Sequence, residues 1–173
     1  MMARPRPVRP DENQQWTLAE RPVGREVRKS DFKLVSNAVP DLAPNELLIR
    51  TLYLSVAPVM RDYMLDGAGF EKPLAIGEVM RGRGVGIVIV QGKLGWQAYS
   101  ISDGSPYYMM YKIQQRIAPL STGIGVLGVT GFTSYLGLVD VGRFKPGDAV
   151  LVSGAAGGVG SSVGQVARSL GAG

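Results

Sequence analysis

A run of small and apolar residues, GAAGGVG at positions 154–160, stands between two patterned segments. Before it, an apolar run predicts a β-strand at Ala149–Ser153 that is buried on both faces. After it, a helix is predicted at Gly158–Leu170, because apolar residues recur at the spacing of one helix face: Val159, Val163, Val166, Ala167 and Leu170. A strand, a glycine turn and a helix in this order form the arrangement that binds the pyrophosphate of a dinucleotide.

The small residues of this turn have separate predicted tasks. Gly157 lets the backbone approach the pyrophosphate, and Gly160 lets the helix pack closely on the strand. The free N–H groups of the first helical turn then face the phosphates. Ala155 replaces the first glycine of G-x-G-x-x-G, so the pattern reads A-x-G-x-x-G. The cofactor-binding residues predicted in the turn are Ala156, Gly157, Gly158, Val159 and Gly160; the alternative is a turn that only packs tightly.

The second half of the chain provides the elements expected to hold this turn. A helix is predicted from Gly131 to Val141, with Thr130 as its N-cap and Gly142 just beyond its end. Its apolar residues at helical spacing predict a buried face made of Phe132, Tyr135, Leu136 and Val139. A turn at Lys145–Asp148 leads into the predicted strand.

The first half is expected to be mainly β-structure. Residues 1–15 are rich in Pro, Arg and Gln and are predicted to form a loose arm. Composition predicts strands at Trp16–Glu20, Phe32–Val35, Glu46–Ser55, Val85–Val90, Trp96–Ser100 and Tyr107–Ile113. A short helix is predicted at Val59–Leu65. The change in character places a domain boundary at about residue 120, giving domains 1–120 and 121–173.

Composition excludes several kinds of chemistry. The 173 residues include neither Cys nor His, which excludes a disulfide, a thiol nucleophile, a Ser-His-Asp triad and zinc held by Cys or His, so no metal is predicted. The formal charge of +5 is spread without a basic stripe or aromatic platforms, so no nucleic-acid partner is expected. Neither a run of about 18 apolar residues nor a secretory signal is visible, so we expect no membrane partner and a cytoplasmic location.

Four stretches resemble one known family: LLIRTLYLSVAPVMRDYM (47–64), GKLGWQAYSISDG (92–104), APLSTGIGVLGVTGFTSYLGL (118–138) and KPGDAVLVSGAAGGVGSSVGQVARSLGA (145–172). They occur in the family's order and cover nearly half of the chain. The sequence is similar to the zinc-independent medium-chain dehydrogenase/reductases. The closest resemblance is to the alkenal/one oxidoreductase branch, which includes leukotriene B4 12-hydroxydehydrogenase/prostaglandin reductases, plant double-bond reductases and curcumin reductase.

The resemblance implies an α/β fold with a mainly β N-terminal part. A GroES-like β-barrel domain is followed by the first βα unit of a Rossmann domain. The implied enzyme is a homodimer without a metal that transfers hydride from NADPH to the β-carbon of a small-molecule enone or enal. Thr133 corresponds to the family threonine that contacts the nicotinamide carboxamide; its structural alternative is a hydroxyl bonded to a helical carbonyl. No catalytic residue is assigned.

Two other functions stay open beside the implied one. The first is quinone reduction, which uses the same fold and hydride donor. The second is a catalytically silent domain that binds a partner through exposed apolar surface, because a single βα unit leaves its strand uncovered.

The sequence departs from the family pattern in three places. It ends after the first βα unit, 13 residues beyond Gly160, whereas the acidic residue that reads the ribose is expected about 20 residues beyond the glycines. NAD and NADP are therefore not distinguished, and the isolated chain is expected to bind NADPH very weakly, if at all, and to show little or no ene-reductase activity. Val90 is followed directly by Gln91, where the family has a further strand. Val59 replaces the family tyrosine; Tyr63 is a candidate replacement, but packing is the favoured interpretation for Tyr63, as it is for Trp96.

Overall fold

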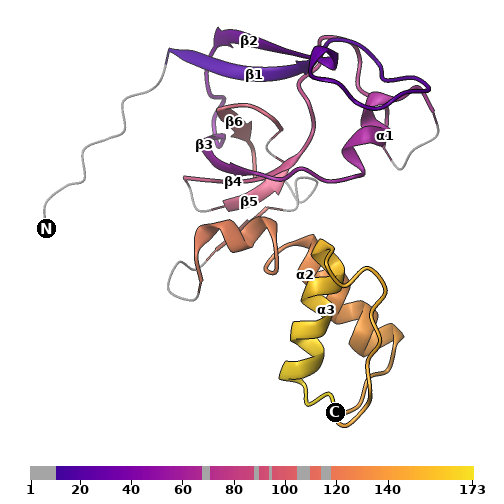
Figure 1. Ribbon diagram of the computed structural model, residues 1–173. Helices are drawn as coiled ribbons and strands as arrows, with labels where there is room; N and C mark the ends of the chain where they lie inside the picture. Colours follow the sequence, from indigo (N-terminus) through magenta and orange to yellow (C-terminus); the bar gives the residue numbers. More distant parts are fainter. Residues whose placement is uncertain (1–10, 68–70, 88–89, 94, 105–109, 114–117) are drawn as a thin grey trace, which may run out of the picture. The chain divides into compact units, whose positions relative to one another are not determined.

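The computed structural model describes residues 11–67, 71–87, 90–93, 95–104, 110–113 and 118–173. The chain divides into two compact units, Met1–Tyr111 and Lys112–Gly173 (Figure 1). The described strands belong to the first unit, except that the last of them crosses the division with its final residue, Lys112, and the second unit contains α2 and α3. The boundary predicted from sequence, at about residue 120, lies inside the second unit.

The strands of the first unit form two sheets. β1 (Glu12–Leu18) pairs antiparallel with β2 (Phe32–Ala38). The second sheet has five strands in the order β6–β3–β4–β5–β7. These strands are β3 (Leu47–Leu54), β4 (Arg83–Gly86), β5 (Val90–Lys93), β6 (Tyr99–Ser102) and β7 (Tyr111–Lys112). Backbone hydrogen bonds connect β1 to the chain ahead of β6, because the N–H of Trp16 donates to the carbonyl oxygen of Trp96 at 2.8 Å.

The apolar run Val85–Val90, predicted as one strand, is instead a hairpin. β4 ends at Gly86, and β5 begins at Val90 and pairs antiparallel with β4, so that Gly86 lies opposite Val90. A Cβ at Gly86 would overlap the side chain of Ile49 and lie 2.7 Å from the carbonyl oxygen of Arg50, so β3 passes very close to this end of β4. The apolar composition predicted β-structure, but it carries no signal for the point at which the chain reverses.

Other bounds differ as well. β1 begins at Glu12, so the predicted loose arm of residues 1–15 is wrong at its end. The reason is a polar contact, since the buried Asn13 side chain donates to the carbonyl oxygen of Tyr99 and accepts from its N–H, both at 2.9 Å. The strand predicted at Trp96–Ser100 is found further along the chain, as β6 at Tyr99–Ser102. Of the predicted strand Tyr107–Ile113, residues 107–109 lie outside the described residues.

The core of the first unit consists of nearly fully buried aliphatic and sulfur-containing side chains: Leu18, Met60, Met64, Leu74 and Met80. Helix α1 (Met60–Met64) supplies two of them and lies within the predicted helix Val59–Leu65. Tyr63 and Trp96 pack against this cluster, which confirms the packing interpretation of both residues. The Trp96 ring also stacks on Phe32, with the ring centroids 5.8 Å apart.

A buried carboxylate closes the connection between β1 and β2. Asp31 ends the short helix η1 (Lys29–Asp31), and its side chain is fully buried. Its oxygens accept hydrogen bonds from the Arg25 guanidinium, at 2.9 and 2.6 Å, and from the backbone N–H of Arg28 at 2.7 Å. These bonds, the Arg25 bonds most of all, lower the pKa of Asp31 to about 2, although burial alone would raise it.

The second unit consists of helices and extended connections. η3 (Leu120–Ile124) precedes α2 (Val129–Leu136), which continues into the π-helical turn η4 (Gly137–Val141); α3 (Gly158–Ser169) follows. Both predicted caps of α2 are wrong. Gly128 is the N-cap, and Thr130 cannot act as one because its hydroxyl donates to the carbonyl oxygen of Gly125 at 2.6 Å. Gly142 keeps a right-handed conformation, and Arg143 adopts the left-handed one with φ 52°.

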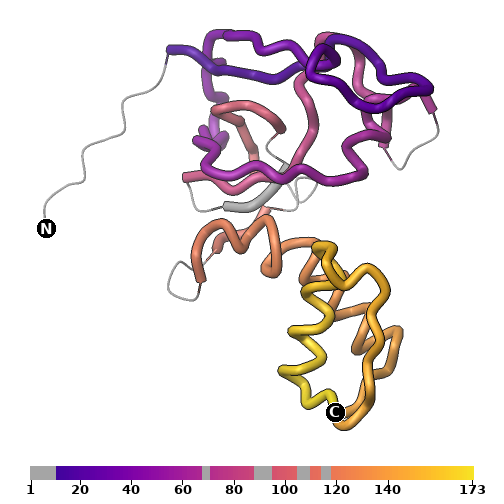
Figure 2. The backbone as a smooth tube through the Cα atoms, in the orientation of Figure 1, coloured from indigo at the N-terminus to yellow at the C-terminus, as the bar shows by residue number. Residues whose placement is uncertain are grey.

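The predicted strand Ala149–Ser153 is not a strand. Its backbone runs beside α3 (Figure 2), but no segment among the described residues pairs with it. A strand requires a neighbour that satisfies its N–H and C=O groups. Leu151 is 100% exposed as a result. The predicted buried face of α2 is likewise wrong for Phe132, Tyr135 and Leu136, which are all exposed.

Candidate functional site

The glycine turn is closed by its own backbone. Gly154 adopts a left-handed conformation (φ 64°), and its carbonyl oxygen accepts a hydrogen bond from the N–H of Gly157 at 2.9 Å. Gly157 is the N-cap of α3, and it supplies no side-chain cap. The N–H groups of the first turn therefore lack helical partners, and the first turn contains no acidic residue. The positive end of the helix dipole favours an anion at this position.

Gly160 has a different task from the predicted one. A Cβ at Gly160 would overlap the carbonyl oxygen of Gly154 and lie 2.9 Å from the Cα of Ala155. The glycine therefore permits close contact between the helix and the turn, rather than between the helix and a strand. At Gly157, a Cβ would lie 3.2 Å from the same carbonyl oxygen. Both positions favour glycine because the turn folds tightly over the start of α3.

A buried serine that the sequence analysis did not single out holds α3 against α2. Ser134 is fully buried, and its hydroxyl lies 2.7 Å from the carbonyl oxygen of Thr130 and 2.9 Å from that of Val159. The second of these contacts crosses to the first turn of α3. The sequence contains one signal for this contact, because Gly131 and Ser134 are small residues three positions apart and therefore share a helix face. Both residues are buried in α2.

A groove of about 590 Å³ in the second unit brings the glycine turn and α2 together. Four of the predicted cofactor residues line it: Thr133, Gly157, Val159 and Gly160. Ala156 and Gly158 do not line the groove; a Cβ at Gly158 would instead lie 3.3 Å from Cγ2 of Thr130. Thr133 is exposed, and among the described residues its hydroxyl bonds to no helical carbonyl, so the structural alternative for Thr133 is not observed.

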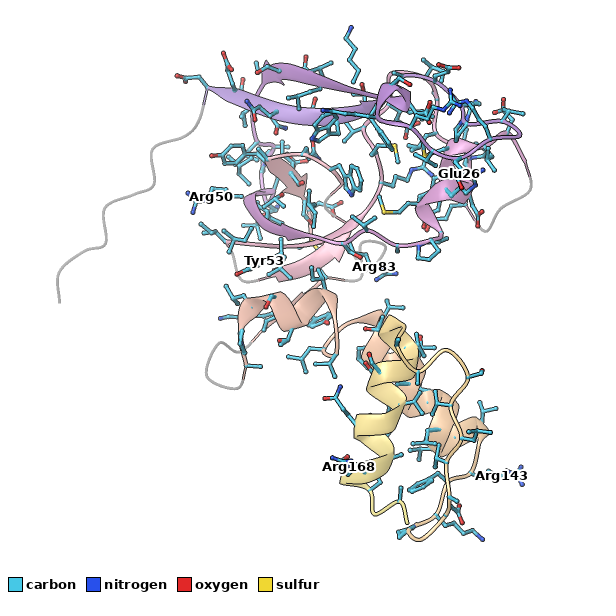
Figure 3. All side chains as sticks on the ribbon, viewed as in Figure 1. Glu26, Arg50, Tyr53, Arg83, Arg143 and Arg168 are labelled. Carbon is cyan, nitrogen blue, oxygen red and sulfur yellow. The ribbon has the colours of Figure 1, made fainter. Side chains whose placement is uncertain are left out.

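The side chains along this groove are mainly apolar. Val150, Val152 and Val163 contribute to its walls, and none of the described residues that line it is charged. Figure 3 labels two arginines of this unit, Arg143 and Arg168. Arg168 belongs to the last turn of α3, at the opposite end from the glycine turn. A phosphate in the groove would therefore be held by backbone N–H groups and the helix dipole rather than by an ion pair.

In the first unit, Val59 and Tyr63 line one small cavity of about 50 Å³. Val59 stands where the family has a tyrosine. The Tyr63 ring packs against the core and lies under the guanidinium of Arg81, whose central carbon is 5.9 Å from the ring centroid. The two candidate positions are therefore neighbours, although the Tyr63 ring is held by packing.

Across the part of the chain that the structure describes, no group of three or more His, Cys, Asp or Glu side chains is placed to hold a metal ion. Within the same residues, every helix is too short or too polar to cross a membrane.

Comparisons with known proteins agree on one family. The protein-family model described as the N-terminal domain of oxidoreductase matches residues 14–110 of this chain. The NADPH-dependent curcumin reductase of Escherichia coli (strain K12) is 38% identical over 168 residues, covering 90% of this chain and 48% of that protein. Prostaglandin reductase 1 of Bos taurus is 38% identical over 165 residues, covering 88% and 48%. The chain thus spans about half the length of the curated relatives that it matches.

A solved structure extends this agreement to the fold. CurA from Vibrio vulnificus, in complex with NADPH, matches with a TM-score of 0.77 and 37% identity, over 92% of this chain and 50% of that one. The predicted fold class is confirmed, with a mainly β, GroES-like N-terminal part followed by the start of an α/β Rossmann domain.

Proposed function

This chain belongs to the oxidoreductase family whose N-terminal domain matches residues 14–110, the zinc-independent medium-chain dehydrogenase/reductases, and from this membership we propose that it is part of an NADPH-dependent enone and enal reductase. The reaction is hydride transfer to the β-carbon of an α,β-unsaturated ketone or aldehyde. One observation carries the proposal: the glycine turn, the start of α3 and Thr133 line a single groove. The names of the relatives, a curcumin reductase and a prostaglandin reductase, support a small-molecule substrate.

The residues of the groove fit a dinucleotide. Gly157 and Gly160 line the groove, and the absence of a Cβ at both lets the turn fold closely over the start of α3. The uncapped N–H groups at the start of α3 would hold the pyrophosphate. The Thr133 hydroxyl would bind the nicotinamide carboxamide, the role that the resemblance implies for it. The NADPH named in the CurA complex supports NADPH as the dinucleotide.

The bound cofactor supplies the hydride, and the protein supplies placement. Ser134 holds the start of α3 on α2, so the phosphate-binding N–H groups keep a constant separation from Thr133. Val159 and Val163 line the groove with apolar surface, against which the cofactor would pack. The residue that protonates the α-carbon is left unassigned.

The first experiment tests the cofactor site. We would titrate the ¹⁵N-labelled chain with NADPH and follow its backbone amide signals. We expect weak but saturable shifts that are largest at Thr133, Gly157 and Gly160. Shifts confined to the first unit, or no saturable shift, would contradict the site.

The second experiment tests the reaction. The chain, in excess over substrate so that one slow turnover is visible, is incubated with NADPH deuterated at the transferred position and with an enone or a benzoquinone. The expected product is a saturated ketone with deuterium on its β-carbon. Deuterium on the carbonyl carbon, or reduction of the quinone alone, would contradict enone reduction.

A further inference from the structure

The small cavity of the first unit has polar groups that the proposed reaction does not use. It lies where the chain leading from β3 into α1 passes the start of β4, and apolar walls come from Ala57, Val59 and Met60. A water molecule needs roughly 10–15 Å³ of such space. The cavity, at about 50 Å³, therefore has room for a group of a few heavy atoms, but not for a whole large ligand.

Arg83 brings a guanidinium to this cavity, which is also lined by Arg81 and by the carboxylate of Glu71. Arg81 pairs with that carboxylate, since its Nη1 lies 3.9 Å from Oε2 of Glu71, and its Nη2 lies 3.0 Å from Oε1 of Glu78. Arg83 is partly buried, and its guanidinium forms no ion pair or hydrogen bond with any described residue. On the neighbouring strand β5, the residue opposite Arg83 is Lys93, so strand pairing places no carboxylate opposite Arg83.

Two residues with hydroxyl groups line the same cavity. Ser55 and Tyr63 both line the cavity, and neither hydroxyl forms a hydrogen bond with the residues that the structure describes. The backbone holds Ser55 beside Arg83, because the N–H of Ser55 donates to the carbonyl oxygen of Arg83 at 2.9 Å. The indole N–H of Trp96 donates to the carbonyl oxygen of Ser55 at 3.3 Å, so both backbone polar groups of Ser55 are hydrogen-bonded.

We propose that this cavity binds the carboxylate group of a small apolar molecule, with Arg83 as the ion-pair partner and the Ser55 and Tyr63 hydroxyls as hydrogen-bond donors. Guanidinium and hydroxyl groups suit a carboxylate, because the first supplies charge and parallel N–H donors and the second supplies O–H donors. The apolar walls suit the carbon atoms next to the carboxylate. All of these residues belong to the first unit, so the inference does not depend on NADPH or on the reaction proposed above.

The test is a calorimetric titration of the chain with benzoate and with benzamide, which has nearly the same shape but no charge. We expect saturable benzoate binding that is about tenfold or more tighter than benzamide binding. The Arg83→Gln variant should lose about tenfold or more in benzoate affinity, the usual size of a charge-assisted hydrogen bond. The matched control is Arg50→Gln, because Arg50 is an exposed arginine of β3 that lies away from the cavity and has no ion pair with the described residues (Figure 3). It should leave benzoate affinity unchanged.

A milder variant keeps the test decisive if Arg83→Gln does not fold. Tyr63→Phe retains the ring that packs under Arg81 and removes only the hydroxyl. It should weaken benzoate binding by about threefold to tenfold, with little change for benzamide. Equal affinity for benzoate and benzamide, an equal loss in Arg50→Gln and Arg83→Gln, full benzoate affinity in Tyr63→Phe, or no saturable binding would overturn the proposal.

Discussion

Ser134 in α2 and Val159 in the first turn of α3 are joined by a hydrogen bond, with the serine hydroxyl 2.9 Å from the valine carbonyl oxygen. Ser134 is fully buried, so water has no access to replace this bond. The bond ties the two helices together just after the glycine turn. The groove therefore depends on a contact between residues that are 25 positions apart in the sequence.

Replacing Ser134 by Ala should destabilise the second unit. The carbonyl oxygen of Val159 loses a buried donor, which typically costs about 1–2 kcal/mol in the free energy of unfolding. Chemical unfolding and amide hydrogen exchange of the first turn of α3 would measure the effect. Ser169→Ala is the control, because that exposed hydroxyl bonds only within α3, to the Val166 carbonyl oxygen. Equal stability of both variants would show that the interhelical bond contributes nothing.

Replacing either of two glycines of α3 by alanine should change the free energy of unfolding, but in opposite directions. At Gly160 the added Cβ would overlap the Gly154 carbonyl oxygen, and such overpacking typically costs about 1–3 kcal/mol. At Gly164 a Cβ meets no atom within 4 Å, so alanine should stabilise the helix by about 0.5–1 kcal/mol. Thermal unfolding of the two variants tests the pair. A Gly160→Ala protein as stable as the original would contradict the close contact of turn and helix.

Replacing Gly157 by Val should weaken NADPH binding. Its backbone angles suit valine, but the side chain would occupy the space between the turn and the phosphate-binding N–H groups. Losing phosphate hydrogen bonds should reduce affinity by about tenfold or more. The amide titration described above measures the change, with Gly164→Ala as the control that should keep its affinity. An unchanged dissociation constant for Gly157→Val would argue against this turn as the phosphate site.

Lowering the pH should destabilise the first unit by protonating Asp31. The pKa of its carboxyl is lowered from 3.8 to about 2 in the folded chain, mainly by the Arg25 hydrogen bonds. Its contribution to stability is therefore complete above the unfolded pKa and disappears as the pH falls from 3.8 toward 2. Asp31→Asn should be less stable than the original at neutral pH, and the difference should shrink across that interval. Urea unfolding at several pH values would measure it, and a pH-independent difference would contradict the assignment.

The exposed side chain of Leu151 should promote self-association. Burying a leucine typically contributes about 1.5–3 kcal/mol, and Leu151 is 100% exposed beside an apolar groove. Size-exclusion chromatography should show concentration-dependent association that Leu151→Glu reduces. Val141→Glu provides the comparison, because Val141 is 81% exposed but does not line the groove. If both variants behave alike, the association does not occur through this groove.

Features that depend on neighbouring residues could be predicted from the sequence. The helix predicted at Gly158–Leu170 is found at Gly158–Ser169, because helical spacing of apolar residues and a glycine turn are local properties. The β-character of the first half was predictable for the same reason. Of the three glycines predicted in the turn, Gly157 and Gly160 line the groove and Gly158 does not. The reason for a glycine at position 160 was not predictable, since the atom that its Cβ would overlap belongs to the folded turn.

The remaining features required the tertiary structure, because they depend on which segments become neighbours. Val85–Val90 is a hairpin because β4 finds β5 as its partner, and Ala149–Ser153 is not a strand because no described segment pairs with it. The same applies to single residues. Ser134 reaches Val159 only after α2 and α3 pack together. The strand predicted from sequence began at Val85, and only the fold extends β4 back to Arg83. The fold also places Arg83 beside Ser55 and Tyr63, with Lys93 opposite it on β5, because side chains distant in sequence share a cavity only when the chain between them has folded.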